Sequence, residues 1–188
     1  MRGLIAAIAL TAFCVSSALA DPPKQTPAAP ADALRLTPGE AVTLQFDSDM
    51  ATVTITERGP GQLSQSDADS AQRLAAGEYG NATGRDYATV PVRPGEAPPP
   101  PVAPNAVRLT FVELQGTNQS VLLIENGYDL ALNYRARMSA SGHDQPTDVC
   151  QVAPNHRGFE NWPYHIDQLD LSSFRLTPFT TGDRLVCE

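Results

Sequence analysis

The chain has 188 residues, with 21 Asp+Glu against 13 Lys+Arg and a formal net charge of −8 at pH 7. This acidic balance argues against nucleic acids and anionic membranes as partners, because both favour surfaces rich in Lys and Arg. The length suits one domain with a hydrophobic core, even without the first 20 residues.

Residues 1–20 have the features of a cleaved secretory signal peptide. Arg2 precedes an apolar run over 4–15, and Ala18-Leu19-Ala20 places small residues at the positions that signal peptidase reads. At ~1.5 Å per residue the run is too short for a ~30 Å hydrocarbon core, so we expect no membrane anchor after cleavage. The short signal and the Ala/Pro-rich leader favour a bacterial source. We therefore expect a periplasmic or extracellular protein.

Cys150 and Cys187 are the two cysteines that remain after signal cleavage. In an oxidising compartment an isolated pair favours a disulfide, which would close a loop of about 40 residues and stabilise the fold by ~4 kcal/mol. A redox role is the alternative, but no Cys-x-x-Cys is present.

The N-terminal part predicts a leader and then a hairpin. Residues 21–35 are rich in Pro and Ala and lack apolar periodicity, which indicates a disordered leader. Structure is expected to begin near Leu36. Alternating apolar residues over 42–46 and 51–55, joined by the polar turn 47–49, predict a β-hairpin.

Residues 57–105 form an irregular and proline-rich insertion. Within it, residues 66–76 predict a weakly amphipathic helix capped by Ser66 or Asp67. The seven prolines of 91–104 predict a stiff polyproline II connection. A hairpin alone is unstable in water, so the preceding hairpin must pack against the C-terminal half. We thus expect one domain over 36–188.

The C-terminal half contains the clearest strand patterns. Residues 107–114 alternate, and the apolar run of 120–125 indicates a strand covered on both faces. Strict alternation over 130–138 predicts a half-buried central strand. Asn126-Gly127 is typical of a hairpin turn, so the strands on either side of it are predicted to pair.

The last forty or so residues predict shorter pieces. Residues 139–147 are polar and turn-like, 148–152 form a short strand, and 154–163 form an irregular loop. One or two strands follow over 164–176, and 184–187 returns to Cys150.

Seven to nine short strands with no strong helix predict an all-β fold, an antiparallel β-sandwich. Their spacing resembles the immunoglobulin-like kind, although the Cys-Trp-Cys spacing of antibody domains is not matched. The resemblance is one of pattern alone.

A metal site is the first chemistry to consider. The three histidines His143, His156 and His165 lie close in sequence to acids such as Asp167. Zinc or iron needs three or four converging donors, and neither His-x-His nor His-Glu-x-x-His is present. We interpret these histidines as solvated side chains and expect no cofactor. A Gly-x-Ser-x-Gly elbow and a Gly-rich phosphate loop are also missing, which argues against an enzyme.

Two groups of residues could contact a partner. Phe159, Trp162 and Tyr164 lie in the predicted loop of 154–163 or just after it, and aromatic residues are favoured at interfaces. The alternative, which we favour, is that Phe159 and Trp162 close the end of the core. Arg135 and Arg137 point outward from the predicted central strand and offer a patch for an anionic partner. The alternative, which we favour, is that they pair with acids on neighbouring strands.

The first functional hypothesis is an exported, monomeric, non-catalytic sandwich that binds a protein of the cell envelope as an accessory, adaptor or inhibitor. The alternatives are a metal-binding protein or metal-dependent hydrolase using the cluster of 143–167, and a carbohydrate-binding module with Trp162 and Tyr164 as stacking platforms.

Overall fold

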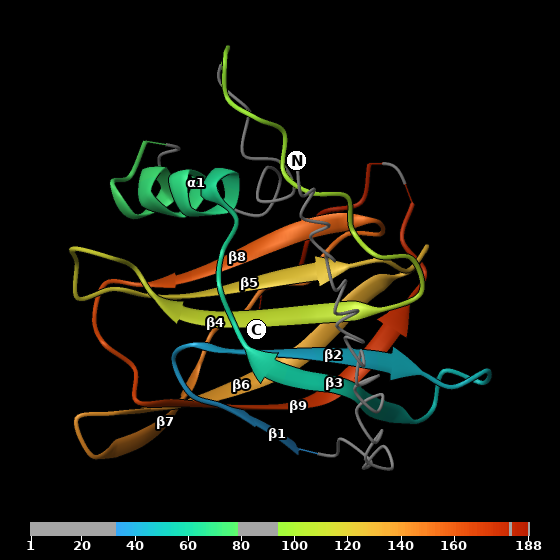
Figure 1. Ribbon diagram of the computed structural model, residues 1–188. Coiled ribbons are helices and arrows are strands. Elements are labelled where there is room, and N and C mark those ends of the chain that lie inside the picture. Colours follow the sequence, from blue (N-terminus) through green and yellow to red (C-terminus); the bar gives the residue numbers. More distant parts are fainter. Residues whose placement is uncertain (1–32, 79–93, 181, 188) are drawn as a thin grey trace, which may run out of the picture.

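A computed structural model describes residues 33–78, 94–180 and 182–187 of the chain. Within these residues, two antiparallel sheets pack face to face, and one helix lies outside them (Figure 1). The predicted all-β sandwich is therefore confirmed. The predicted signal peptide and most of the predicted leader lie outside the described residues.

The sheets contain four and five strands. The four-stranded sheet has the order β1-β9-β6-β7, with β1 (Ala33–Leu36), β9 (Gln168–Thr177), β6 (Ala131–Ala140) and β7 (His143–Thr147). The five-stranded sheet has the order β3-β2-β4-β5-β8, with β3 (Val53–Pro60), β2 (Glu40–Phe46), β4 (Val107–Glu113), β5 (Ser120–Asn126) and β8 (His156–Trp162). The predicted hairpin is β2–β3, and β2 also pairs with β4, which joins the hairpin to the C-terminal half.

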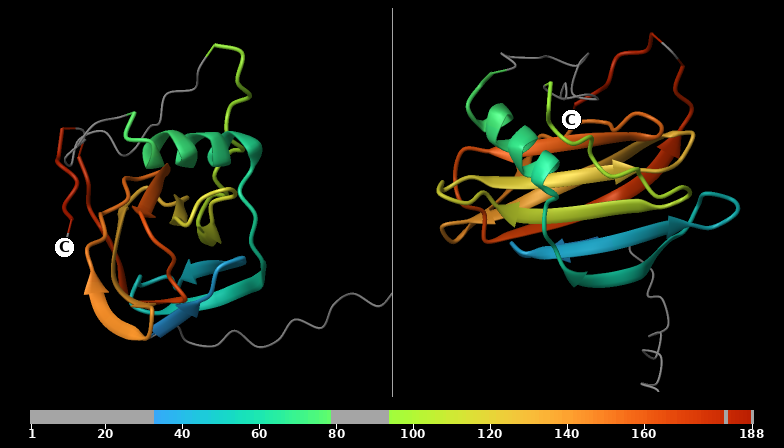
Figure 2. Two further views of the ribbon diagram at one scale, coloured as in Figure 1. Left: turned by 90° about the vertical axis from the view of Figure 1, so that its left-hand side faces the viewer. Right: turned by 45° about the horizontal axis from the view of Figure 1, so that its top comes forward.

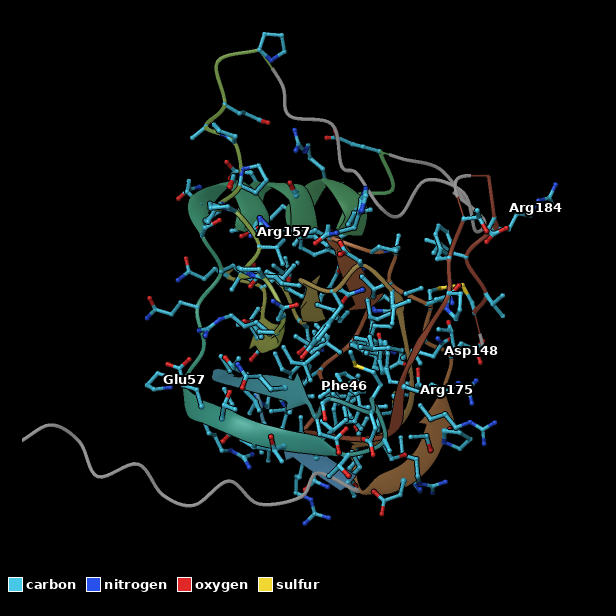
Figure 3. The ribbon with its side chains drawn as sticks, turned by 90° about the vertical axis from the view of Figure 1, so that its right-hand side faces the viewer. Phe46, Glu57, Asp148, Arg157, Arg175 and Arg184 are labelled. Carbon is cyan, nitrogen blue, oxygen red and sulfur yellow. A yellow bond between two sulfur atoms is a disulfide. The ribbon has the colours of Figure 1, made fainter. Side chains whose placement is uncertain are left out.

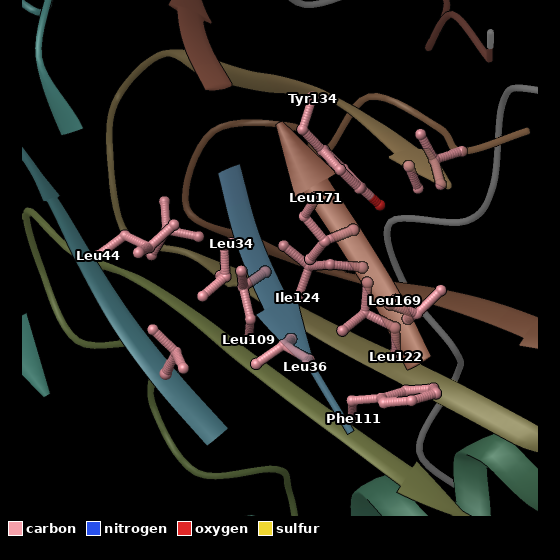
Figure 4. Packing of buried hydrophobic residues seen from close by; sticks show 14 of the residues in the cluster. Leu34, Leu36, Leu44, Leu109, Phe111, Leu122, Ile124, Tyr134, Leu169 and Leu171 are labelled. Atoms are coloured by element: carbon pink, nitrogen blue, oxygen red, sulfur yellow. The ribbon is translucent and has the colours of Figure 1, made fainter. Parts of the chain in front are cut away.

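Strand β6 is a central strand, as its alternation predicts. It lies between β9 and β7, with Leu132, Tyr134, Ala136 and Met138 buried and the arginines between them exposed. The buried side chains enter a core between the two sheets. The leucine, isoleucine and phenylalanine side chains of four strands meet there (Figure 4): Leu34 and Leu36 from β1, Leu109 and Phe111 from β4, Leu122 and Ile124 from β5, and Leu169 and Leu171 from β9.

Helix α1 (Gln65–Ala75) covers the outer face of the five-stranded sheet beside β8 (Figure 2). Its N-cap is Ser64, whose hydroxyl accepts from Asp67 N at 3.2 Å, so the predicted caps Ser66 and Asp67 were wrong by two or three residues. A second apolar layer lies under the helix and contains Ala71, Leu114, Val121, Leu123 and Phe159. Strand β5 is thus covered on both faces, as predicted.

The predicted hairpin across Asn126-Gly127 was wrong. Strand β5 pairs with β4 and β8, whereas β6 pairs with β7 and β9, so the chain crosses from one sheet to the other at this point. Asn126 and Gly127 instead make tertiary contacts at this crossing. The buried Asn126 amide donates to the carbonyls of Leu130, Val152 and Ala153 at 2.8–3.2 Å.

Gly127 allows the proline-rich segment to approach the crossing. A Cβ at this position would lie 1.8 Å from the carbonyl oxygen of Ala103. The main chain is also bonded here, because Asn105 N donates to Gly127 O at 2.8 Å and Gly127 N donates to Ala106 O at 2.9 Å. The end of the proline-rich segment is therefore fixed to the sandwich.

Other boundaries differ from the sequence predictions. The first strand of the described residues begins at Ala33, before the predicted Leu36, and most of the supposed turn 139–147 belongs to the β6–β7 hairpin. The supposed loop 154–163 is largely strand β8, and 148–152 pairs only through isolated bridges. The described part of the proline-rich segment, 94–104, has no regular secondary structure.

The predicted disulfide between Cys150 and Cys187 is present. It ties the end of the described chain to the segment between β7 and β8. No helix in the described ranges is long and apolar enough to cross a membrane.

Candidate functional site

Two of the three predicted aromatic contact residues are core residues. Strand β8 directs Phe159 into the layer under α1 and Trp162 into the core between the sheets, and both are at least nine-tenths buried. The Trp162 indole donates to Thr147 Oγ1 at 2.8 Å. Tyr164 follows β8 and is 38% exposed. Trp162 is therefore not available as a stacking platform for a carbohydrate, and the favoured interpretation of Phe159 and Trp162 as core residues is confirmed.

The histidines do not form a common site. His165 lies between two carboxylates, 3.2 Å from Asp167 Oδ1 and 3.7 Å from Glu113 Oε2. His156 lies at the start of β8 with Nδ1 against the carbonyl oxygen of Pro154, and His143 is exposed on β7. Within the parts of the chain that the structure describes, no group of three or more His, Cys, Asp or Glu side chains is arranged to hold a metal.

The predicted arginine pair lies on the solvent side of the four-stranded sheet. Alternation on β6 directs both Arg135 and Arg137 away from the core. The register then adds two arginines that the sequence did not reveal. Arg35 of β1 and Arg175 of β9 are also exposed and point to the same side. We call this surface, with Asp144 and Asp170, the arginine face.

Asp170 sits between two of these arginines. It is opposite Arg35 on one neighbouring strand and opposite Arg137 on the other, so the three side chains form one row across β1, β9 and β6. The Arg35 Nε donates to Asp170 Oδ1 at 2.9 Å. This hydrogen bond and the charge of Asp170 raise the pKa of Arg35, and Asp144 adds to the effect.

No protein-family model, curated protein or solved structure matches this chain. The case for a functional surface thus depends on its residues alone.

The arginine face is unusual in its charge. Among the described residues it holds four of the chain's 13 Lys+Arg but two of its 21 Asp+Glu. It is thus a positive surface on an acidic protein. Figure 3 shows Arg175 on the opposite side of the sandwich from Glu57, which lies on the five-stranded sheet.

Guanidinium groups suit the recognition of carboxylates. Each is planar, always charged and able to donate two parallel hydrogen bonds to one carboxylate. One exposed ion pair contributes only ~0–1 kcal/mol, so useful affinity requires several pairs to form together. Four arginines held by three hydrogen-bonded strands meet that requirement because the sheet fixes their spacing.

Proposed function

We propose that this chain is an exported, monomeric, non-catalytic sandwich that acts by protein–protein contact in the periplasm or outside the cell. We propose further that the arginine face is the surface that binds, and that its partner there is a protein with an acidic patch. The observation that carries the proposal is the gathering of four arginines on one sheet of an otherwise acidic chain.

Two further observations support export. Residues 1–20 have the composition of a signal peptide, and the bond between Cys150 and Cys187 is of a kind that persists in oxidising compartments. The cysteine bond also fits a protein that must stay folded without chaperones of the cytosol.

Binding through the arginine face would depend on salt. Complementary charge speeds the encounter of two proteins, and ions screen it over about 8–10 Å at physiological ionic strength. Such a face serves an accessory, adaptor or inhibitor role because it selects a partner without reacting with it.

The test compares two variants of equal net charge. Arg137→Ser/Arg175→Ser removes two arginines from the arginine face, and the control Arg108→Ser/Arg184→Ser removes two that lie outside it. Envelope extract is passed over each immobilised protein. We expect a protein captured by wild type and by the control to be captured about tenfold less by the first variant. We also expect soluble polyglutamate to displace it. Equal capture by the two variants, or no captured protein above background, would refute the proposal.

A further inference from the structure

A row of charged side chains crosses the outer face of the five-stranded sheet. The register aligns one residue from every strand: Glu57 of β3, Thr43 of β2, Arg108 of β4, Glu125 of β5 and Arg157 of β8. Asp67 of α1 continues the row, because Arg157 Nη1 lies 3.2 Å from Asp67 Oδ1. We call the five charged residues, which alternate in sign, the charge row.

One end of the charge row is buried under α1. Arg157 Nη2 lies 2.5 Å from Glu125 Oε1, and the Arg157 and Asp67 side chains are only 10% and 6% exposed. Figure 3 shows Arg157 directly beneath the helix. These ion pairs hold α1 on the sheet. The Arg157 Nε is buried and has no hydrogen-bond partner within the described residues.

The other end is open and loosely held. The Arg108 and Glu57 side chains are 40% and 70% exposed. Arg108 Nη1 lies 3.5 Å from both Glu57 Oε2 and Thr43 Oγ1, and its Nε lies 4.0 Å from Glu125 Oε2. All three separations are at or beyond the limit of a hydrogen bond. Arg108 can therefore give up these weak contacts at little cost in free energy and bind a better acceptor.

A cavity of about 390 Å³ lies above the charge row. Its walls are residues 100–103 of the proline-rich segment together with Gln62 and Ser64 before α1, and Arg108, Glu125 and Arg157 line its floor. This volume is in the range of small-molecule sites. The proline-rich wall keeps its place because Asn105 and Ala106 are bonded to Gly127.

We propose that this cleft binds a small zwitterion, such as a free amino acid or a dipeptide. Its carboxylate would lie on Arg108, and its ammonium group would lie on Glu57. The side chains of Arg108 and Glu57 reach over Thr43 until Nη1 and Oε2 lie 3.5 Å apart, so one small zwitterion can contact both charges. Proline and alanine of the wall contact its apolar part.

The alternation of sign argues against a simple ion as the ligand. An anion on Arg108 would also face Glu57 and Glu125, and a cation on Glu57 would also face Arg108. Only a ligand that carries both charges meets an opposite charge at each contact.

The test uses backbone amide NMR of the folded chain. Glycylglycine and free proline are added at ~10 mM, and acetate and methylammonium serve as single-charge probes. We expect the zwitterions to shift amides of β2, β3 and β4, and the single-charge probes to leave them unchanged. Both Arg108→Gln and Glu57→Gln should weaken binding about tenfold, whereas Arg137→Gln on the arginine face should not.

Three results would overturn the inference: no shifts with either zwitterion, equal shifts with acetate, or unchanged binding by both cleft variants. The zwitterion probes and the two cleft variants leave the arginine face intact. A negative result in this test therefore does not count against the proposed protein–protein contact. The two cleft variants change exposed side chains, so an unchanged amide spectrum without ligand checks that each one folds.

Discussion

Glu160 offers a direct test of the packing between the sheets. It points from β8 toward the four-stranded sheet, where the Tyr134 hydroxyl donates to its Oε1 at 3.3 Å and Cys150 N donates to the same oxygen at 2.6 Å. Burial raises the pKa of this carboxyl from 4.5 to about 7, the two hydrogen bonds oppose the shift, and the charge of Asp148 adds to it. The carboxyl therefore titrates near neutral pH in the folded protein.

The raised pKa makes stability depend on pH in a defined direction. Between pH 4.5 and 7 the folded state holds a proton at Glu160 that the unfolded state releases, so the free energy of unfolding falls as pH rises through this window. One pKa unit corresponds to ~1.36 kcal/mol, which gives a loss of about 3 kcal/mol as an upper figure. Below and above the window this group adds no pH dependence, because both states carry the same charge.

The substitution Glu160→Gln removes the titration and keeps an oxygen for Cys150 N. We expect the variant to match wild type near pH 4.5 and to exceed it by up to about 3 kcal/mol at pH 8. Urea denaturation of both proteins, with the disulfide intact, gives their free energies of unfolding at several pH values. The titration of the other acids affects both proteins equally, so it cancels when one free energy is subtracted from the other. Parallel stability curves over the whole range would refute the reasoning, as would a variant that loses stability at pH 8.

Three further predictions concern single structural features and are measured by urea denaturation. Asn126→Asp should destabilise by about 3 kcal/mol, because a carboxylate of nearly the same shape cannot donate to the three carbonyls; a stability equal to wild type would contradict this. Gly127→Ala should cost roughly 1–3 kcal/mol because its Cβ would overlap the proline-rich segment, whereas the control Gly59→Ala meets no atom within 4 Å and should cost much less. Replacing Cys150 and Cys187 with serine should cost up to about 4 kcal/mol, and reductant should then have no further effect.

The sequence predicted those elements whose two faces differ. Strands β2, β3 and β6 have one face in the core and one in water, so their side chains alternate visibly. Strand β5 was recognised by a different pattern, a continuous apolar run, because both of its faces are covered. Strand β8 was missed because α1 covers its outer face, where Arg157 is buried in ion pairs instead of solvated.

Pairing between distant segments could not be predicted. Asn126-Gly127 has the composition of a hairpin turn, yet both residues are required by tertiary contacts at the crossing between sheets. The arginine face was half predicted, since Arg135 and Arg137 share one strand whereas Arg35 joins them only through β9. The charge row was not predicted at all, because only the register of the strands brings its residues together.

The bond between Cys150 and Cys187 encloses the whole of β8 and the whole of β9, one strand from each sheet. A chain that loses every other contact but stays oxidised therefore keeps these two strands in one covalent ring. When this oxidised chain refolds, the disulfide already links the segments around Cys150 and Cys187. The conformational search for this long-range contact is therefore shorter. A reduced chain must make the same encounter by diffusion, so the oxidant supply around a newly made chain would set how quickly it assembles.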